Sequence, residues 1–365
     1  MRLRASFTKK VFKFNFTAKS SRGPMEDKVS WFIKLWDERS PEVYGIGECG
    51  PLPGLSLDAR TDFEEVLERI VLEIADVKYS EVSNQFPSPH LRLFNEIIPR
   101  DFPSITFGAE TAWLDLQHGG RRVIFHNDFL LGEPIPINGL IWMGGLEEML
   151  EQVHKKVRQG FRCIKLKIGG LDFNEECDLL QEIRVHYSAS NITIRLDANG
   201  AFSPEDALSK LEALKQFTIH SIEQPIAAGQ YDVMQHLCQK SPIPIALDEE
   251  LIPHQQLDKK RELLTELRPA FIILKPTLHG GIGGCNEWIE LSKKMGIGWW
   301  ITSALESNIG LNAICQYTAN HVGNLPHGLG TGAIYQNNIE SPLTVSEGHI
   351  FYDKSRNWDV ESFFS

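Results

Sequence analysis

Five short apolar segments, each ending abruptly in charge, constrain the fold of this chain more than any other feature. They read CIKLKIGG, ITIRLDANGAF, HSIEQP, PIALDEEL and FIILKP, and they lie between residues 163 and 276. Their terminal charges are at Lys167, Asp197, Glu223, Asp248 and Lys275, with spacings of 30, 26, 25 and 27 residues. Each spacing matches one strand followed by one helix. Charges at the carboxyl ends of consecutive parallel strands are typical of an active site in a (β/α) barrel.

The same rhythm continues on both sides of these segments. A strand is expected at residues 135–144, and an amphipathic helix at 146–160 ends in a glycine. A seventh strand begins near residue 297, and HGLGTG at 327–332 forms an eighth strand end or a tight turn. The sequence therefore predicts a complete catalytic barrel of about eight strands over residues 133–340.

The first 132 residues follow a different pattern. Polar and apolar residues alternate at 8–17 and 29–36, which predicts strands, and helical patterns follow at 59–77 and 107–118. A polar loop is expected at 19–27, and a second loop, rich in glycine and proline, carries Leu52 and Leu55. We expect an α+β capping domain over residues 1–132, to which a strand-like tail at 341–365 returns.

Composition and charge exclude several classes of protein. The chain has 365 residues, of which 42% are hydrophobic and 23% charged, as expected of a folded globular protein. A net charge of −11 argues against a nucleic-acid partner. The six cysteines form no CxxC pair, and we find neither a signal peptide nor an apolar run long enough for a membrane span. We therefore expect a cytoplasmic protein with reduced thiols and no membrane partner.

Two lysines on the predicted second strand indicate a functional site. Lys165 and Lys167 lie at period two, so both side chains point to the same face. Two lysines at this spacing can form a solvated strand face. Here they are flanked by Ile164, Leu166 and Ile168, a pattern that describes a strand buried on both faces. Buried lysines are costly unless the protein uses them, which favours a functional role.

The three acids of the series predict a metal site. Asp197, Glu223 and Asp248 would converge from three adjacent strand ends, where carboxylates repel one another unless a cation lies among them. Oxygen ligands without histidine or cysteine suit Mg²⁺, with Mn²⁺ as the alternative. Each acid could instead cap the helix after its own strand. That alternative explains one acid more readily than three at a regular period between lysine strands.

A divalent ion facing lysines across a barrel has a defined chemical use. The ion and Lys275 can stabilise the enediolate that forms when a proton leaves the carbon next to a carboxylate. A free lysine titrates at about 10.4, and both a neighbouring ammonium and a bound dication lower that pKa. We therefore expect metal-assisted proton abstraction from a small-molecule carboxylate, with Lys167 as the base.

These residues resemble a known family. The KLK of the second strand, the acids of the third to fifth and the lysine of the sixth are similar to the muconate-lactonising subgroup of the enolase superfamily. The resemblance covers nearly the whole chain. It implies an enolase-type (β/α) barrel, a modified TIM barrel, with an α+β cap built from the N-terminal region and the C-terminal tail. Within the subgroup, SRGPMEDKVSWFIKL, TSALESNIGLNA and HGLGTG look most like the enzymes that form o-succinylbenzoate in menaquinone biosynthesis.

The resemblance implies a reaction and a role for each central residue. The reaction is the syn dehydration of 2-succinyl-6-hydroxy-2,4-cyclohexadiene-1-carboxylate. Lys167 would remove the α proton and then protonate the departing hydroxyl. Lys275 would be the cation on the other face, and Lys165 would support Lys167 and the substrate carboxylate. The three acids would hold Mg²⁺, which takes the ring carboxylate.

Further residues would contact the rest of the substrate. Asn199 follows Asp197 by two residues and is a predicted polar neighbour of the substrate. The loop residues predicted to bind substrate are Ser303, Ser307 and Asn308, for the succinyl carboxylate, together with Arg22 and Leu55. Turn chemistry in the loops and a plain surface arginine are the alternatives. The histidines, including His327, are expected to be structural or solvated.

Three other functions remain open. An N-acylamino acid racemase or a dipeptide epimerase would use the same lysine pair, although HGLGTG lacks an acid for a dipeptide ammonium. A Schiff-base aldolase would use Lys167 or Lys275 on a carbonyl group and would leave the acids unexplained. A non-catalytic barrel is the third. The sequence does not specify an oligomeric state.

Overall fold

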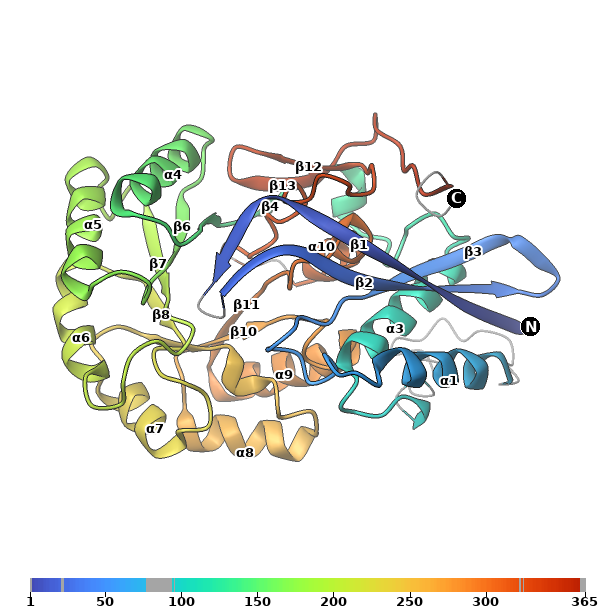
Figure 1. Ribbon diagram of the computed structural model, residues 1–365, viewed down its shortest axis with the longest axis horizontal. Coiled ribbons are helices and arrows are strands. Elements are labelled where there is room, and N and C mark those ends of the chain that lie inside the picture. The colour runs from blue at the N-terminus through green and yellow to red at the C-terminus, as the bar shows by residue number, and fades with distance from the viewer. Residues whose placement is uncertain are drawn as a thin grey trace.

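The computed structural model describes residues 2–20, 23–76, 94, 96–321, 323 and 325–361. Its N-terminal part is an antiparallel sheet of three strands in the order β1-β2-β3, and among the described residues the helices α1 and α3 pack on it (Figure 1). These elements are β1 (Leu3–Ser20), β2 (Gly23–Asp37), β3 (Ser40–Cys49), α1 (Phe63–Asp76) and α3 (Pro103–Gln117). They enclose an apolar core of their own, which includes Leu35, Leu67 and Trp113.

The first two strands are longer than the alternating pattern indicated. The predicted loop at 19–27 is wrong for most of its length, because β2 begins at Gly23 and pairs back with β1 as far as Ser20. The register shifts between Lys13 and Ala18, and pairing then resumes. Glycine and proline at 23 and 24 lie at the start of β2, where neither interrupts the ladder.

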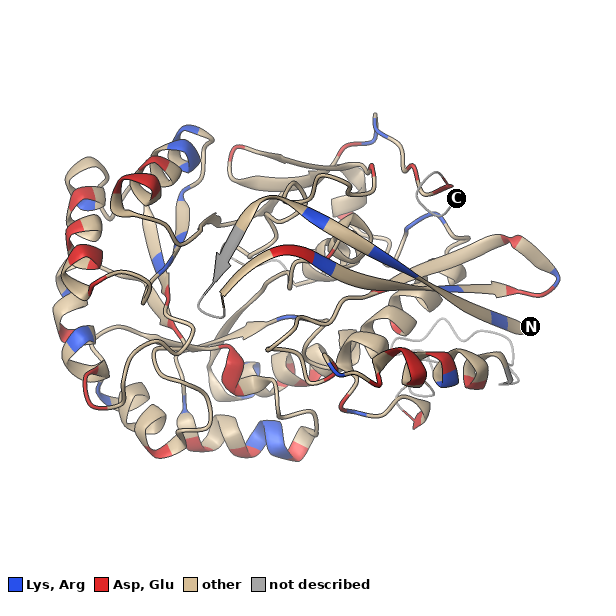
Figure 2. Cartoon of the chain, in the orientation of Figure 1, with Lys and Arg blue, Asp and Glu red and all other residues tan. Residues whose placement is uncertain are grey.

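The barrel is a parallel sheet of seven strands in the order β11-β10-β9-β8-β7-β6-β5. Its strands are β5 (Gly139–Ile141), β6 (Cys163–Lys167), β7 (Thr193–Asp197), β8 (Ser221–Glu223), β9 (Ile245–Leu247), β10 (Phe271–Leu274) and β11 (Gly298–Ile301). The helices between them are α4 (Leu146–Arg158), α5 (Phe173–His186), α6 (Ala207–Leu214), α7 (Tyr231–Lys240), α8 (Leu257–Leu267) and α9 (Gly281–Met295). They form the outer layer (Figure 1), and acidic and basic residues are interspersed along them (Figure 2).

The predicted eighth strand is reduced to two isolated bridges. His327 pairs with Ile137 next to the first barrel strand, and Gly328 pairs with Thr302 just past β11. These two residues therefore lie between the two edges of the seven-stranded sheet. Three glycines within HGLGTG weaken a strand, because they lose more backbone entropy and offer no side chain to pack. The (β/α) barrel with its α+β cap is confirmed, with this one strand shortened.

The end of the chain contacts both parts. The strands β12 (Leu343–Ser346) and β13 (His349–Tyr352) form a small sheet with β4 (Ile135–Pro136), which precedes the barrel. Val360 instead joins an apolar cluster with Phe12 of β1. The described residues also form α10 (Asn308–Ala319) and short 3₁₀ turns at Asp128–Leu131, Lys215–Phe217 and Glu249–Leu251. No helix in the described ranges is long and apolar enough to cross a bilayer.

The cap packs closely on the barrel and so places its loops over the site. The strand β3 meets α3 with almost no space, since a Cβ at Gly47 would lie 1.8 Å from the carbonyl oxygen of Gly108. The helix α3 in turn contacts α9 of the barrel. Leu52 of the second cap loop packs with Leu278 and Ala304, which follow β10 and β11. The cap loop therefore lies against the loops at the carboxyl ends of the barrel strands.

Candidate active site

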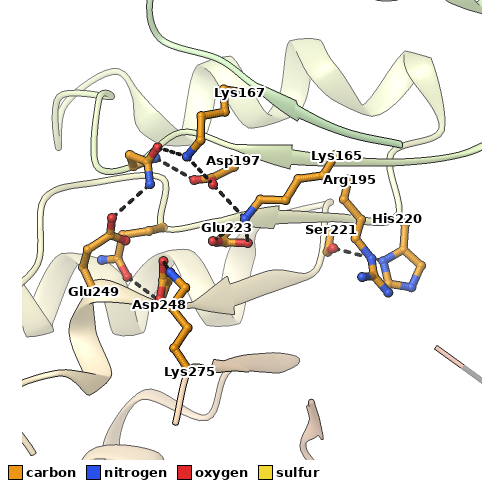
Figure 3. A network of polar contacts seen from close by, with 12 residues as sticks. Lys165, Lys167, Arg195, Asp197, His220, Ser221, Glu223, Asp248, Glu249 and Lys275 are labelled. Atoms are coloured by element: carbon orange, nitrogen blue, oxygen red, sulfur yellow. Dashed lines mark hydrogen bonds and ion pairs between the residues drawn. The ribbon is translucent and has the colours of Figure 1, made fainter. Parts of the chain in front are cut away.

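The charged residues of the five segments meet at one end of the barrel. Asp197 and Glu223 are the last residues of β7 and β8, while Asp248 and Lys275 directly follow β9 and β10. Lys167 pairs in register with Asp197, and Asp197 with Glu223. Because neighbouring parallel strands end together, these side chains gather in one polar network (Figure 3).

Both lysines of β6 contact the acids. The ammonium of Lys165 lies 2.8 Å from Oδ2 of Asp197 and 2.7 Å from Oε2 of Glu223. The ammonium of Lys167 lies 2.9 Å from the same oxygen of Asp197. Lys165 and both acids are almost fully buried, so these ion pairs are screened little by solvent.

A third lysine approaches from another part of the barrel wall. Lys275 forms an ion pair with Asp248, and three strands, β7 to β9, separate β6 from β10. Lys275 is 8% exposed and Asp248 is 1% exposed. The cluster therefore has ammonium groups on two sides and carboxylates between them, as Figure 3 shows.

Burial and pairing shift the pKa values in opposite directions. Burial alone would lower the pKa of Lys165, but the charges of Asp197 and Glu223 outweigh it and raise that pKa. Burial alone would raise the pKa of Asp197, and Lys165 and Lys167 instead hold it well below its usual range. Burial and the charge of Asp197 raise the pKa of Glu223 to about 8. Of the three acids, Glu223 is therefore the one whose negative charge the neighbouring lysines neutralise least.

Amide side chains position this cluster. Asn199 accepts a hydrogen bond of 2.6 Å from Lys167 and donates one of 3.0 Å to Glu249. Its backbone has a φ of +44°, in the left-handed region that asparagine tolerates. Gln224 accepts from the backbone N–H groups of Asp248, at 3.2 Å, and Glu250, at 3.3 Å. The prediction did not include Gln224, although it directly follows a predicted metal ligand.

Arg195 is a second residue that the sequence pattern did not indicate. It lies on β7 two residues before Asp197, so its side chain points into the barrel on the same face, farther from the strand end. The guanidinium stacks on Trp300 with 3.8 Å between its carbon and the ring centre, and it donates to the carbonyl of Pro326 at 2.7 Å. In Figure 3 it lies on the far side of Lys165 from Lys167, away from the carboxyl ends of the strands.

The carboxylate oxygens of the three acids are chemically suited to bind a divalent cation. In the part of the chain that the structure describes, no three or more acids, histidines or cysteines are grouped so that they could hold a metal ion. Lys165 nevertheless bridges Asp197 and Glu223, so a cation already neutralises this pair. The Oδ1 atom of Asp248 is buried and has no hydrogen-bond partner among the described residues. An all-oxygen donor set with one unused buried oxygen suits Mg²⁺.

A cavity of about 1270 Å³ opens above the cluster, between the barrel mouth and the cap. The lysines and Asp197 form the base of the cavity. The cap loop with Leu52, Pro53 and Leu55 and the loops of the barrel line its sides. Asn199, Leu55 and Ser303, for which substrate contact was predicted, line the cavity. Gly328 and Gly330 line it from HGLGTG. Such a volume accommodates a small organic substrate.

Other predicted binding residues lie elsewhere. Ser307 is fully buried, begins α10 as its N-cap, and donates a 2.5 Å hydrogen bond to Glu48. Asn308 donates to the carbonyl of Ile339 at 2.6 Å, and neither residue lines the cavity. Their positions therefore do not support a direct contact with the succinyl carboxylate. Sequence reasoning placed both in a loop, although the helix begins at Asn308. Arg22 lies outside the described residues.

Two buried histidines take structural positions. His279 accepts a hydrogen bond from the backbone N–H of Lys275 at 2.9 Å, and His327 accepts one from Ile301 at 3.0 Å. Burial lowers the pKa of each imidazole to about 3. Both are neutral at ordinary pH, and they fix the backbone beside β10 and β11.

The fold and the site define a class of protein. Residues 148–354 match the family model described as enolase C-terminal domain-like. The match covers more than half of the chain, and the chain belongs to this family, within the enolase superfamily. Among the relatives, the chain is 42% identical over 361 residues to the o-succinylbenzoate synthase of Desulfotalea psychrophila, covering 94% of this chain and 97% of that protein.

Solved structures agree with the architecture. The crystal structure of MenC from Desulfotalea psychrophila superposes with a TM-score of 0.84 at 38% identity, covering 96% of this chain and all of that one. A substrate-liganded L-Ala-D/L-Glu epimerase from Bacillus subtilis superposes with a TM-score of 0.82 at 19% identity, covering 96% of each chain. The latter likeness concerns the fold alone.

Proposed function

We propose that this chain is an o-succinylbenzoate synthase that dehydrates 2-succinyl-6-hydroxy-2,4-cyclohexadiene-1-carboxylate. The observation that carries the proposal is the placement of Lys167 and Lys275 in one cavity, on either side of three buried acids. The 42% identity to a synthase of that name supports the same substrate. A role in menaquinone biosynthesis and a cytoplasmic location belong to this proposal, as do domain limits at residues 132 and 340.

Lys167 is the proposed base. Its ammonium nitrogen is held by Asp197 and Asn199, so the lone pair of the neutral form has a fixed position at the cavity base. Lys167 takes the proton from the carbon next to the ring carboxylate. The same nitrogen then returns a proton to the leaving hydroxyl on that face. The broken C–H bond supplies the electrons of the new double bond, water departs, and the ring becomes aromatic.

The other residues hold the substrate for this step. Asp197, Glu223 and Asp248 would hold Mg²⁺, which when bound supplies positive charge to the ring carboxylate as electrons move onto it. Lys275 places a second cation on the opposite face. The cap loop with Leu52 and Leu55 covers the cavity and excludes water from the reacting carbon.

The Lys167→Gln variant tests the proposal. We expect kcat for dehydration to fall by a factor of about 10²–10⁴, the usual contribution of a general base. Lys155→Gln is the matched control, since Lys155 is exposed but lines the same cavity from α4. Loss of the absorbance of the cyclohexadiene substrate measures the rate. Full turnover by the Lys167 variant, or none by the native chain, would refute the assignment.

A racemase of N-acylamino acids is the second candidate. Proton removal and return on opposite sides of one carbon requires an amine on each face, and the positions of Lys167 and Lys275 on either side of the acid cluster support such an arrangement. Exchange of the α proton in deuterium oxide, followed by NMR with N-succinyl amino acids and with Ala-Glu, measures this activity. Proton exchange with a higher kcat/KM than dehydration would make racemisation the main function.

A further inference from the structure

Lys28 is a buried cation in the cavity to which the proposed mechanism gives no role. It lies on β2, where inward and outward positions alternate: Lys28 and Ser30 are buried, and Asp27 is exposed. Only 3% of Lys28 is exposed, and its side chain lines the same cavity as Lys167. The cap therefore brings a positive charge to the side of the cavity away from the acids.

Among the residues that the structure describes, the ammonium of Lys28 has no carboxylate partner. Its hydrogen bonds go to backbone carbonyls, at 2.8 Å to Leu305 and 3.4 Å to Ala304. Of the cavity-lining lysines and arginines that the structure describes, three are less than a tenth exposed, and the other two, Lys165 and Lys275, are ion-paired. An ammonium carries three donors, so at least one of its N–H groups remains for a ligand.

The acids nearest to Lys28 are already hydrogen-bonded. Burial lowers the pKa of Lys28, while the charges of Glu48 and Glu306 offset part of that effect. The donors to these two acids are Ser30, Ser307 and the N–H of Gly310 for Glu48, and Thr277, Ser303 and the N–H of Ala304 for Glu306. Both acids thus favour a charged Lys28 without forming an ion pair with it.

The neighbouring backbone makes room for this ammonium. A Cβ at Gly50 would lie 2.6 Å from Nζ of Lys28, closer than side chains tolerate. Gly50 starts the cap loop that carries Leu52 and Leu55 over the cavity. Lys28 therefore lies where β2, the cap loop and the loop after β11 meet.

We propose that Lys28 binds the second carboxylate of a dicarboxylic substrate and so selects substrates with an anionic side chain. The inference rests on the proposed function, in which the ring carboxylate is bound at the acid and lysine cluster. The succinyl carboxylate then extends toward the cap. A charge-assisted hydrogen bond forms between that carboxylate and Lys28, whose own partners are neutral carbonyls. A substrate whose chain ends in a neutral group gains no such bond.

The Lys28→Met variant tests the inference through binding. The dissociation constants of o-succinylbenzoate and of its ester, methylated at the succinyl carboxylate, are measured by calorimetry in buffer with Mg²⁺. We expect the variant to bind the diacid at least about tenfold more weakly and the ester equally well, since one charge-assisted hydrogen bond is lost. In turnover, KM should rise by a similar factor while kcat changes less than about threefold, because the hydrogen bonds of Lys28 within the described residues go to Ala304 and Leu305 and not to the proposed base or the three acids.

Matched variants separate binding from folding. Lys34→Met on the same strand removes a lysine that does not line the cavity, and it should leave both affinities unchanged. Lys28→Arg should keep the preference for the diacid, and Gly50→Ala, which displaces the ammonium, should reduce it. If Lys28→Met does not give a cooperative melt, these two variants decide the question.

Two results would overturn the inference: an unchanged ratio of diacid to ester affinity in folded Lys28→Met or in Gly50→Ala, or no binding of the diacid by the native chain. Failure of the proposed function is a separate result. It would appear as diacid binding that depends on Lys28 without dehydration by the native chain.

Discussion

At the residue scale, the centre balances three buried acids against three lysines. Each ammonium contacts at least one carboxylate, and the acids are at most 2% exposed. Buried ion pairs gain little net stability, because desolvation cancels most of the attraction. Their value lies in holding charged groups at fixed positions before a substrate arrives. The Oδ1 atom of Asp248 has no hydrogen-bond partner among the described residues, so it remains available to a cation.

Addition of metal should therefore stabilise the native chain. We expect millimolar Mg²⁺ to raise the melting temperature, because an ion that binds only the folded state adds RT ln(1 + [L]/Kd) to the free energy of unfolding. Asp248→Asn should reduce this shift by more than half. Scanning calorimetry with EDTA or Mg²⁺ measures it, and Asp258→Asn, whose side chain is 80% exposed, is the control. Equal shifts in both variants would exclude Asp248 as a ligand.

The sequence was sufficient to predict that these lysines and acids lie close together, because all of them except Lys165 come at the end of an apolar strand, at a regular spacing. It did not identify Lys28. The alternation along β2 could have indicated this residue, because Lys28 lies on the same buried face as Ser30 and Phe32. For Ser307, in contrast, the sequence contains no information that could decide its role. A serine in a loop can face a ligand or cap a helix, and only the partner Glu48, 259 positions away in sequence, decides between these roles.

At the scale of elements, the packing of β3 on α3 depends on how closely their backbones approach more than on the strand and helix propensities of their residues. The strand β3 and the helix α3 approach until backbone meets backbone at Gly47 and Gly108. The burial of α3 explains why this helix carries apolar residues on most of its faces. The helical pattern at 107–118 indicated α3, but the sequence did not show that this helix touches β3, because a glycine in a strand has several explanations.

Gly47→Ala should therefore destabilise the cap. The new methyl group would lie 1.8 Å from the oxygen of Gly108 and 2.7 Å from the nitrogen of Ala112, so the strand or the helix must shift. We expect a loss of about 3 kcal/mol or more in urea unfolding, at the upper end for overpacking. Gly145→Ala is the control, because its Cβ meets nothing within 4 Å and its φ is −69°. Similar midpoints for the two variants would contradict this account.

At the scale of the whole molecule, function depends on cap and barrel being one packed unit. The period of strand and helix units was sufficient to predict the barrel and the change of pattern before it. The pairing of the tail with β4 was not readable, because short strands with partly exposed faces specify no partner. The proposed domain limits at residues 132 and 340 remain a prediction. The helix α3 of the cap contacts both β3 within the cap and α9 of the barrel, so it joins the two parts.

Glu110 is a titratable group at this contact between α3 and α9. It is fully buried and accepts hydrogen bonds from the backbone N–H groups of Ile282, at 2.5 Å, and Gly283, at 3.2 Å. Burial raises its pKa from 4.5 to about 8, against the lowering by these two hydrogen bonds. The folded state thus binds a proton that the unfolded chain releases at lower pH.

The pH dependence of stability follows from that difference. Because the folded pKa lies above the unfolded one, the contribution of Glu110 is fully present below pH 4.5 and is lost as pH rises through about 8. Across this window it amounts to a few kcal/mol, at about 1.4 kcal/mol per pKa unit. Glu110→Gln should flatten the decline of the free energy of unfolding between pH 5 and 8. Urea titrations at several pH values measure both slopes, and Glu262→Gln on the exposed surface of α8 should leave the native slope in place. An equally steep decline in Glu110→Gln would mean that this carboxylate is ionised in the folded chain and that the cap docks on the barrel with a buried negative charge.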